Sequence, residues 1–131
     1  MHKRSVLYLD DESGCLNLFR EVFGAEYDVR TAATSAEARQ MLAARPADVV
    51  ISDHTMPGTT GKIFLGEVAA SYPSTYRVLL TGNITVVDAL LEIGVGIIQA
   101  FVTKPWSRET ICRVLERGWA DEEARLGAEW R

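Results

Sequence analysis

The sequence predicts an α/β protein, a doubly wound (βα)5 domain built on a five-stranded parallel sheet. Short apolar runs alternate with segments in which apolar residues recur at helical spacing. Strands that alternate with helices favour a parallel sheet with helices on both of its faces. The chain has 131 residues, which is long enough for one domain with a full hydrophobic core.

The first half of the chain contains three predicted strands and two predicted helices. The apolar runs that we expect as strands are 6–9, 27–31 and 49–52. The helices are 12–23, and a second segment that Ser35 caps and Pro46 ends. The third run is continuously apolar, which is typical of a central strand covered on both faces.

The second half continues the alternation after a loop at 54–61 that is rich in turn formers. Its predicted elements are a helix at 62–71, a strand at 77–80, a helix whose inner stripe is Val87, Leu90 and Leu91, a strand at 97–102, and a last helix from its cap Ser107 to about Arg117.

The composition excludes several classes of function. Apolar residues make up 47% of the chain and charged residues 24%, as in ordinary globular proteins. The net charge is −4 without a basic run, which argues against direct nucleic-acid binding. No apolar stretch has the length of a membrane span or a signal-peptide core, so we expect a cytoplasmic protein without membrane contact. Cys15 and Cys112 lack metal-ligand spacing, and we expect two reduced thiols.

Polar residues close four of the predicted strands. Asp10 and Asp11 follow the first run, Asp53 the third, Thr81 the fourth and Lys104 the fifth. One such residue is usually a turn former or a cap, but open parallel sheets bind ligands at the edge where all of these meet. Because three close carboxylates repel one another, they favour a divalent cation, and oxygen ligands suit Mg2+. The pattern predicts a site for Mg2+ and a phosphoryl group.

Four motifs in this order resemble the receiver domain of two-component response regulators. They are Leu-Tyr-Leu-Asp10-Asp11, Ser52-Asp53-His-Thr-Met56-Pro57-Gly58, Leu-Leu-Thr81-Gly82 and Phe101-Val-Thr-Lys104-Pro105-Trp106. The resemblance extends from about Lys3 to Gly118. It implies the flavodoxin-like strand order 2-1-3-4-5, and it makes the Lys104–Pro105 bond a candidate cis peptide.

The resemblance also implies the roles of the acidic residues and the lysine. Asp53 would accept phosphate from a phosphohistidine on a sensor histidine kinase or phosphotransfer protein. Asp11, Asp53 and the backbone carbonyl of Thr55 would bind Mg2+ directly, and Asp10 would act through metal-bound water. Phosphoryl transfer needs alignment and charge neutralisation, which Mg2+ and Lys104 would provide.

Further positions are implied to transmit the signal and set its duration. Thr81 would hydrogen-bond the phosphoryl group, and Phe101 would follow it as an aromatic switch. Thr55 and Asn83 would tune the lifetime of the phosphate, and Trp106 would belong to the partner-binding face. The expected partners are the kinase and an output domain or output protein.

Two other functions remain open from the residues alone. The first is a Mg2+-dependent small-molecule phosphatase or phosphotransferase, although the haloacid-dehalogenase pattern of Asp-x-Asp is missing because Thr55 stands two residues after Asp53. The second is a receiver-like scaffold that is never phosphorylated. The leading interpretation is a phosphoacceptor that assists its own phosphorylation and dephosphorylation and is not itself an enzyme.

We expect two segments, a receiver domain at 1–118 and a C-terminal helical extension or linker at 119–131. Leu115, Trp119, Leu126 and Trp130 recur at steps that would keep them on one side of a continuing helix. The stripe would either cover the surface of the domain or pair with a second copy in a homodimer. Gly118 and Gly127 weaken the prediction of a helix there.

Overall fold

The computed structural model describes residues 3–56, 59–82 and 86–129. Its main sheet has five parallel strands, β1 (Ser5–Leu9), β2 (Asp28–Ala32), β3 (Val49–Asp53), β6 (Tyr76–Thr81) and β7 (Ala100–Thr103). The strand order is β2-β1-β3-β6-β7, and all four pairings are parallel. This confirms the predicted order 2-1-3-4-5, because β4 and β5 form a separate hairpin.

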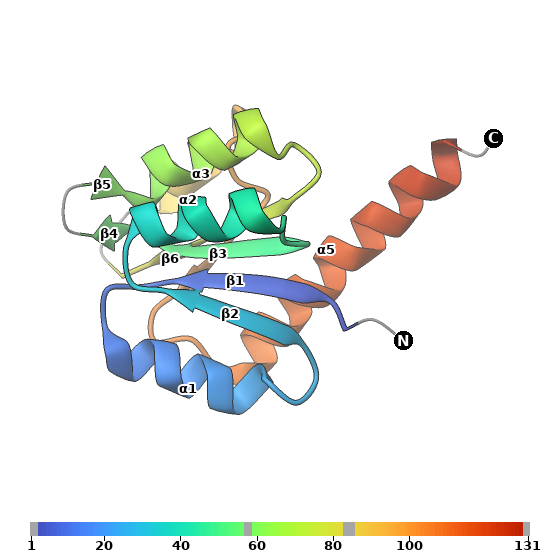
Figure 1. Ribbon diagram of the computed structural model, residues 1–131. Coiled ribbons are helices and arrows are strands. Elements are labelled where there is room, and N and C mark those ends of the chain that lie inside the picture. The colour runs from blue at the N-terminus through green and yellow to red at the C-terminus, as the bar shows by residue number, and fades with distance from the viewer. Residues whose placement is uncertain (1–2, 57–58, 83–85, 130–131) are drawn as a thin grey trace.

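Helices cover both faces of the sheet (Figure 1). They are α1 (Ser13–Phe23), α2 (Ser35–Ala44), α3 (Gly61–Ser71), α4 (Val86–Gly94) and α5 (Arg108–Glu129). Helices α1 and α5 lie on one face, and α2 and α3 lie on the other. No helix in the described ranges is both long and apolar enough to cross a membrane.

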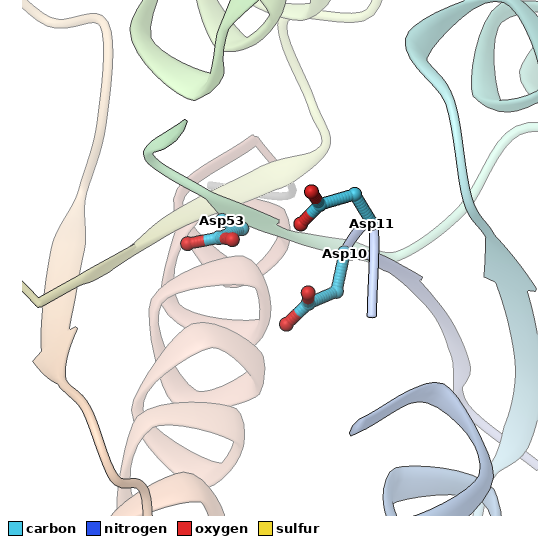
Figure 2. A group of neighbouring side chains, drawn as sticks. All are labelled: Asp10, Asp11 and Asp53. Carbon is cyan, nitrogen blue, oxygen red and sulfur yellow. The ribbon is translucent and has the colours of Figure 1, made fainter. Parts of the chain in front are cut away.

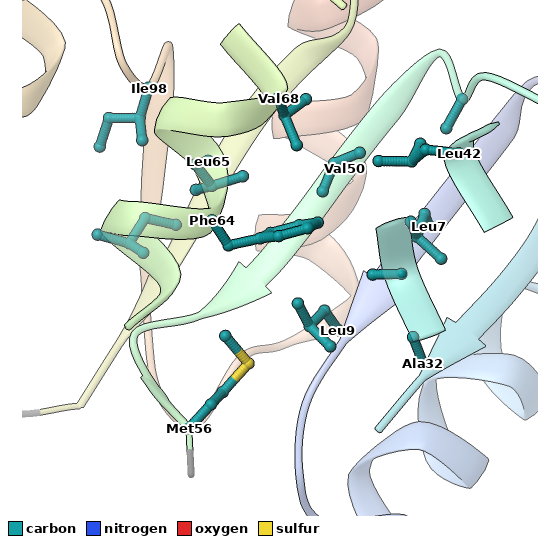
Figure 3. Close-up of a cluster of buried hydrophobic side chains, with 13 residues drawn as sticks. Leu7, Leu9, Ala32, Leu42, Val50, Met56, Phe64, Leu65, Val68 and Ile98 are labelled. Atoms are coloured by element: carbon teal, nitrogen blue, oxygen red, sulfur yellow. The ribbon is translucent and has the colours of Figure 1, made fainter. Parts of the chain in front are cut away.

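The sheet divides the hydrophobic core into two layers, and the side chains of β1 alternate between them. Leu7 and Leu9 point into the cluster beneath α2 and α3, which is drawn in Figure 3. Val6 and Tyr8 point into the cluster beneath α1 and α5. Side chains two residues apart share a face of a strand, so Asp10, which follows Tyr8 by two, continues the α1–α5 side.

Several predicted details needed correction. Thr34, not Ser35, is the N-cap of α2, because its side chain accepts a hydrogen bond from the backbone N–H of Glu37 at 3.1 Å. Within the predicted loop 54–61, β4 (Thr55–Met56) pairs antiparallel with β5 (Thr59–Thr60). The strand expected from residue 97 begins at Ala100.

The predicted inner stripe of α4 was wrong at two of its positions. Leu90 and Leu91 are 54% and 61% exposed, and Ile93 packs against the core instead. Three apolar residues in a short segment allow more than one helical phase, so spacing alone did not identify the buried side.

Helix α5 begins after the predicted cap, since Ser107 Oγ accepts from the backbone N–H of Thr110 at 3.1 Å. It then passes the expected end near Arg117 without a break and projects beyond the sheet (Figure 1). Trp119 stacks on Tyr27 with ring centroids 5.0 Å apart, so the helix is still attached to the domain at this point. The division at residue 118 stays a prediction, and Trp130 lies outside the described residues.

Candidate functional site

Three carboxylates meet at the carboxyl edge of the sheet (Figure 2). Asp10 and Asp11 follow β1, and Asp53 ends the neighbouring strand β3. One oxygen from each carboxylate lies within 4.8 Å of the others. Asp10 and Asp53 are buried, whereas Asp11 is exposed. The edge therefore carries concentrated negative charge that solvent reaches from the side of Asp11.

Lys104 brings a positive charge to this cluster from the end of β7. Its Nζ lies 3.2 Å from Asp53 Oδ2 and 3.3 Å from Asp10 Oδ2. Its backbone N–H donates to the Thr81 carbonyl at 2.8 Å, and the Lys104–Pro105 bond is cis, as predicted. Burial lowers the pKa of Lys104, but the two carboxylates outweigh it and the pKa is raised above its usual value.

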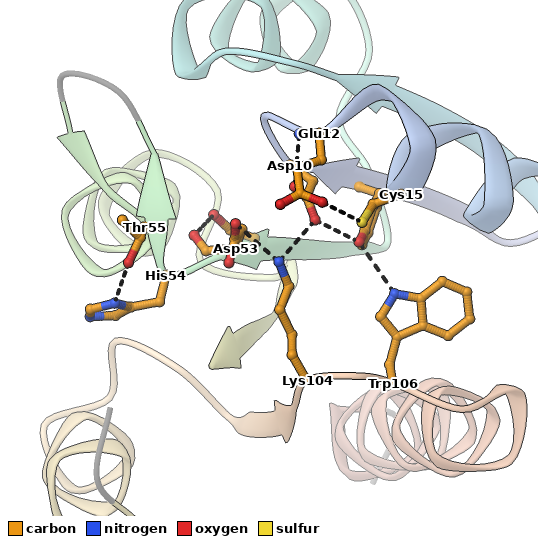
Figure 4. Close-up of polar contacts among 10 residues, drawn as sticks. Asp10, Glu12, Cys15, Asp53, His54, Thr55, Lys104 and Trp106 are labelled. Carbon is orange, nitrogen blue, oxygen red and sulfur yellow. Dashed lines mark hydrogen bonds and ion pairs between the residues drawn. The ribbon is translucent and has the colours of Figure 1, made fainter. Parts of the chain in front are cut away.

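Asp10 accepts hydrogen bonds from two further donors (Figure 4). The hydroxyl of Tyr8 donates to Oδ2 at 2.9 Å, and the backbone N–H of Glu12 donates to Oδ1 at 3.0 Å. Sequence reasoning missed Tyr8, although strand alternation put it on the same face as Asp10. Burial, with the nearby charge of Asp10, raises the pKa of Tyr8, so its hydroxyl keeps its proton at neutral pH.

The surroundings of Asp53 act on both its carboxylate and its backbone. Burial raises its pKa despite the opposing effect of Lys104, and the charge of Asp10 adds to the rise. Beneath it, Gly61 opens α3 so close to the Asp53 carbonyl that a Cβ would lie 2.2 Å from that oxygen. Thr60 caps the same helix by accepting from the backbone N–H of Ile63 at 3.2 Å.

A family model described as the response regulator receiver domain matches residues 6–116. The chain belongs to this family. The receiver domain of this chain is 32% identical to the hydrogenase transcriptional regulatory protein HoxA of Cupriavidus necator over 102 residues, 78% of this chain and 21% of that protein. It is 29% identical to the aerobic respiration control protein ArcA of Escherichia coli, over 95% of this chain and 56% of ArcA. The chain thus spans between a fifth and about half of these relatives.

Solved receiver structures have the same fold. The signal receiver domain of an HD domain-containing protein from Pseudomonas fluorescens superimposes with a TM-score of 0.85 at 26% identity, covering 97% of this chain and 94% of that one. The chemotaxis protein CheY4 of Vibrio cholerae superimposes with a TM-score of 0.79 at 29% identity, covering 88% and 98%. The chain is therefore a receiver domain of the kind found in two-component signalling.

Of the remaining predicted site residues, Thr81 lies at the same edge of the sheet as the acidic cluster. Thr81 is buried at the end of β6, one residue beyond Leu80, which pairs with Asp53. Thr55 is exposed on β4. Asn83 lies outside the described residues.

The two aromatic residues predicted near the site lie on different sides of the sheet. Phe101 is half-buried and lines a groove of about 490 Å³ together with Ile93, Arg113, Val114 and Arg117. Trp106 packs on the α1 side, with its ring centroid 5.6 Å from that of Phe19. The role of Trp106 in partner binding stays a prediction.

Proposed function

We propose that this receiver domain accepts a phosphoryl group on Asp53 from the phosphohistidine of a sensor histidine kinase or a phosphotransfer protein in the cytoplasm. The observation that carries the proposal is the position of the Lys104 ammonium, 3.2 Å from Asp53 and 3.3 Å from Asp10, beside the three-carboxylate cluster. A cation beside a carboxylate nucleophile can offset the charge that the incoming phosphoryl group brings.

The transfer makes one bond and breaks one. A carboxylate oxygen of Asp53 forms a bond to phosphorus, and the P–N bond of the phosphohistidine breaks with its electron pair going to the imidazole. Lys104 pairs with the phosphoryl oxygens. The buried Thr81 ends β6 at the same edge of the sheet and would donate a hydrogen bond from its hydroxyl to the phosphoryl group. The chain assists its own phosphorylation in this way and does not turn over a separate substrate.

The residues at the edge fit a magnesium ion. Asp11 and Asp53 would hold it, with the backbone carbonyl of Thr55 and with Asp10 acting through bound water. Mg2+ prefers hard oxygen ligands and usually retains several waters, and the exposed Asp11 leaves this site open to solvent. When bound, Mg2+ supplies positive charge that offsets the acids and the phosphoryl oxygens.

Phosphorylation would change the partner preference of the surface around Phe101. Thr81 would move toward the phosphoryl group, and Phe101 would follow it, which shifts the population between two conformers. The groove beside Phe101 is bordered by α4, on which Leu90 and Leu91 are exposed. Exposed apolar residues beside a groove support an output domain or output protein as the occupant.

Three further proposals concern duration and assembly. Thr55 and Asn83 would tune the lifetime of the phosphate through access of water to Asp53. Trp106 would contribute to partner recognition from the β7–α5 junction. The helical extension 119–131 would link the receiver to an output domain or pair with a second copy.

The test is intact mass after incubation with acetyl phosphate, with and without Mg2+. We expect one added phosphoryl group in the wild type with Mg2+, and none in Asp53→Asn. The matched control is Asp28→Asn, a half-buried acid at the start of β2 that pairs with Arg45 and should leave labelling unchanged. Labelling that persists in Asp53→Asn would remove Asp53 from the role of phosphoacceptor.

A further inference from the structure

Tyr8 forms a hydrogen-bonded bridge between the acidic cluster and the aromatic core. Its hydroxyl is 2.9 Å from Asp10 Oδ2 on one side and 3.3 Å from Trp106 Nε1 on the other. Tyr8 itself is fully buried on β1. A phenylalanine would fill nearly the same space without a polar atom, so packing alone does not require the hydroxyl. A buried hydroxyl costs free energy unless it is hydrogen-bonded, and here it has two partners.

The donors and acceptors in this bridge allow only one direction. An indole N–H can only donate, and an ionised carboxylate can only accept. The Tyr8 hydroxyl lies between them with a single proton, so it accepts from Trp106 and donates to Asp10. Trp106 thereby fixes the orientation of the proton that Asp10 receives.

The aromatic packing holds this bridge in place. The Tyr8 ring stacks on Phe19 with centroids 4.3 Å apart and planes 5° apart. Phe19 meets the edge of Trp106 at 5.6 Å, and Phe23 lies 5.9 Å from the same indole. Neither end of the bridge can turn away without disturbing the layer beneath α1 and α5.

Asp10 receives donors on both of its oxygens. Oδ2 accepts from Tyr8 and pairs with Lys104, and Oδ1 accepts from the backbone N–H of Glu12. Removing the Tyr8 hydroxyl would leave the buried Oδ2 with Lys104 alone. The carboxylate and the ammonium would then be free to shift together, away from Asp53.

We propose that Tyr8 is a positioning residue for Asp10, and that the indole of Trp106 sets the direction of its hydrogen bond. The proposal rests on the proposed function, in which Asp10 belongs to the Mg2+ site. Mutation of groups that contact a metal through its ligands or its bound water typically lowers metal affinity 10–100-fold, and Tyr8 acts on one such group, Asp10. We expect Tyr8→Phe to bind Mg2+ about tenfold more weakly than the wild type.

The experiment is a Mg2+ titration of the wild type, Tyr8→Phe and Trp106→Phe, followed by backbone amide resonances at Asp11 and Asp53. Trp106→Phe should also weaken Mg2+ binding, but by less than Tyr8→Phe does, because Tyr8 then keeps its hydroxyl and loses only the donor that orients it. The matched control is Tyr27→Phe, which removes a hydroxyl from the same aromatic layer where Tyr27 stacks on Trp119. It should bind as the wild type does.

The indole N–H resonance of Trp106, assigned from its loss in Trp106→Phe, gives a second readout that needs no loss of affinity. It should move on addition of Mg2+ to the wild type, and it should not move in Tyr8→Phe at saturating Mg2+. Two results would overturn the role of Tyr8 while leaving the Mg2+ site in place. One is an equal Mg2+ affinity in the wild type and Tyr8→Phe. The other is a Trp106 indole N–H resonance that does not move when the wild type is saturated with Mg2+. Absence of Mg2+ binding by the wild type would overturn the metal site, and this inference with it.

Discussion

The guanidinium of Arg77 offers the clearest test of what stabilises the sheet at the edge opposite the acidic site. Arg77 is only 6% exposed on β6 and donates to four backbone carbonyls, those of Pro73, Thr75, Gly96 and Ile97. Two of these bonds, to Thr75 and Ile97, are 2.8 Å long. The side chain therefore joins the connection before β6 to the connection before β7.

Arg77→Met should lower the free energy of unfolding by about 3 kcal/mol. A hydrogen bond from a charged donor contributes about 1.5 kcal/mol or more, and the two short bonds supply most of the loss. Methionine keeps an apolar stem of similar length, so the cavity contribution is small. With a urea m-value of about 2 kcal/mol per molar, the midpoint should fall by about 1.5 M.

Urea unfolding followed by circular dichroism measures this shift. The control is Arg113→Met, since Arg113 pairs with Glu109 on the exposed surface of α5. Surface pairs contribute about 0.5 kcal/mol, so the control midpoint should hardly change. A midpoint shift below about 0.5 M for Arg77→Met, with an unchanged m-value, would refute the reasoning.

Three further predictions concern glycines and a thiol. Gly61→Ala should lower the free energy of unfolding by about 2 kcal/mol and slow phosphorylation, because its Cβ would lie 2.2 Å from the Asp53 carbonyl. The control is Gly66→Ala in the same helix, whose Cβ would meet nothing within 4 Å and which should be neutral or stabilising in urea unfolding. Gly118→Ala should cost about 1 kcal/mol in the same assay, because its Cβ would lie 2.8 Å from the Tyr76 ring; a gain in stability would contradict this. Burial, with the charge of Asp10, raises the pKa of Cys15 to about 11. In a Cys112→Ser background its alkylation rate should therefore rise about tenfold per unit of pH from about pH 8 to about pH 10, and a plateau in this range would contradict the shift.

The strands and the polar residues at their carboxyl ends could be predicted because both follow from short-range patterns. The order of the strands came instead from the resemblance to receiver domains. Apolar runs that end in Asp10, Asp53 and Lys104 mark the strands and their carboxyl ends at the same time. Once the strands are parallel, their carboxyl ends must meet at one edge. The chemistry of this carboxyl edge then depends on the types of the residues that follow the strands, which can be read from the sequence.

Contacts between distant segments were not predictable in the same way. Gly118 argued against a continuous helix by propensity, yet α5 passes through it without a break. The Tyr76 ring occupies the space that a side chain at residue 118 would need, so the glycine is required there by packing and does not mark the end of the helix. Strand alternation could have paired Tyr8 with Asp10. The bond from Trp106 to Tyr8 spans 98 residues and depends on packing that no local pattern describes.

Helix α5 lies next to two parts of the molecule that we relate to the acidic cluster, which are Trp106 and the groove that contains Phe101. On one side, Asp10 is hydrogen-bonded to Tyr8 and Tyr8 to Trp106, which lies two residues before the first residue of the helix. On the other side, Arg113 and Arg117 of the helix line the groove that contains Phe101. Under the proposed switch through Thr81 and Phe101, phosphorylation of Asp53 would act on the start and on the flank of the same helix. Because α5 continues to Glu129 as one helix, we expect a change in its packing to be carried along the extension and not lost at residue 118.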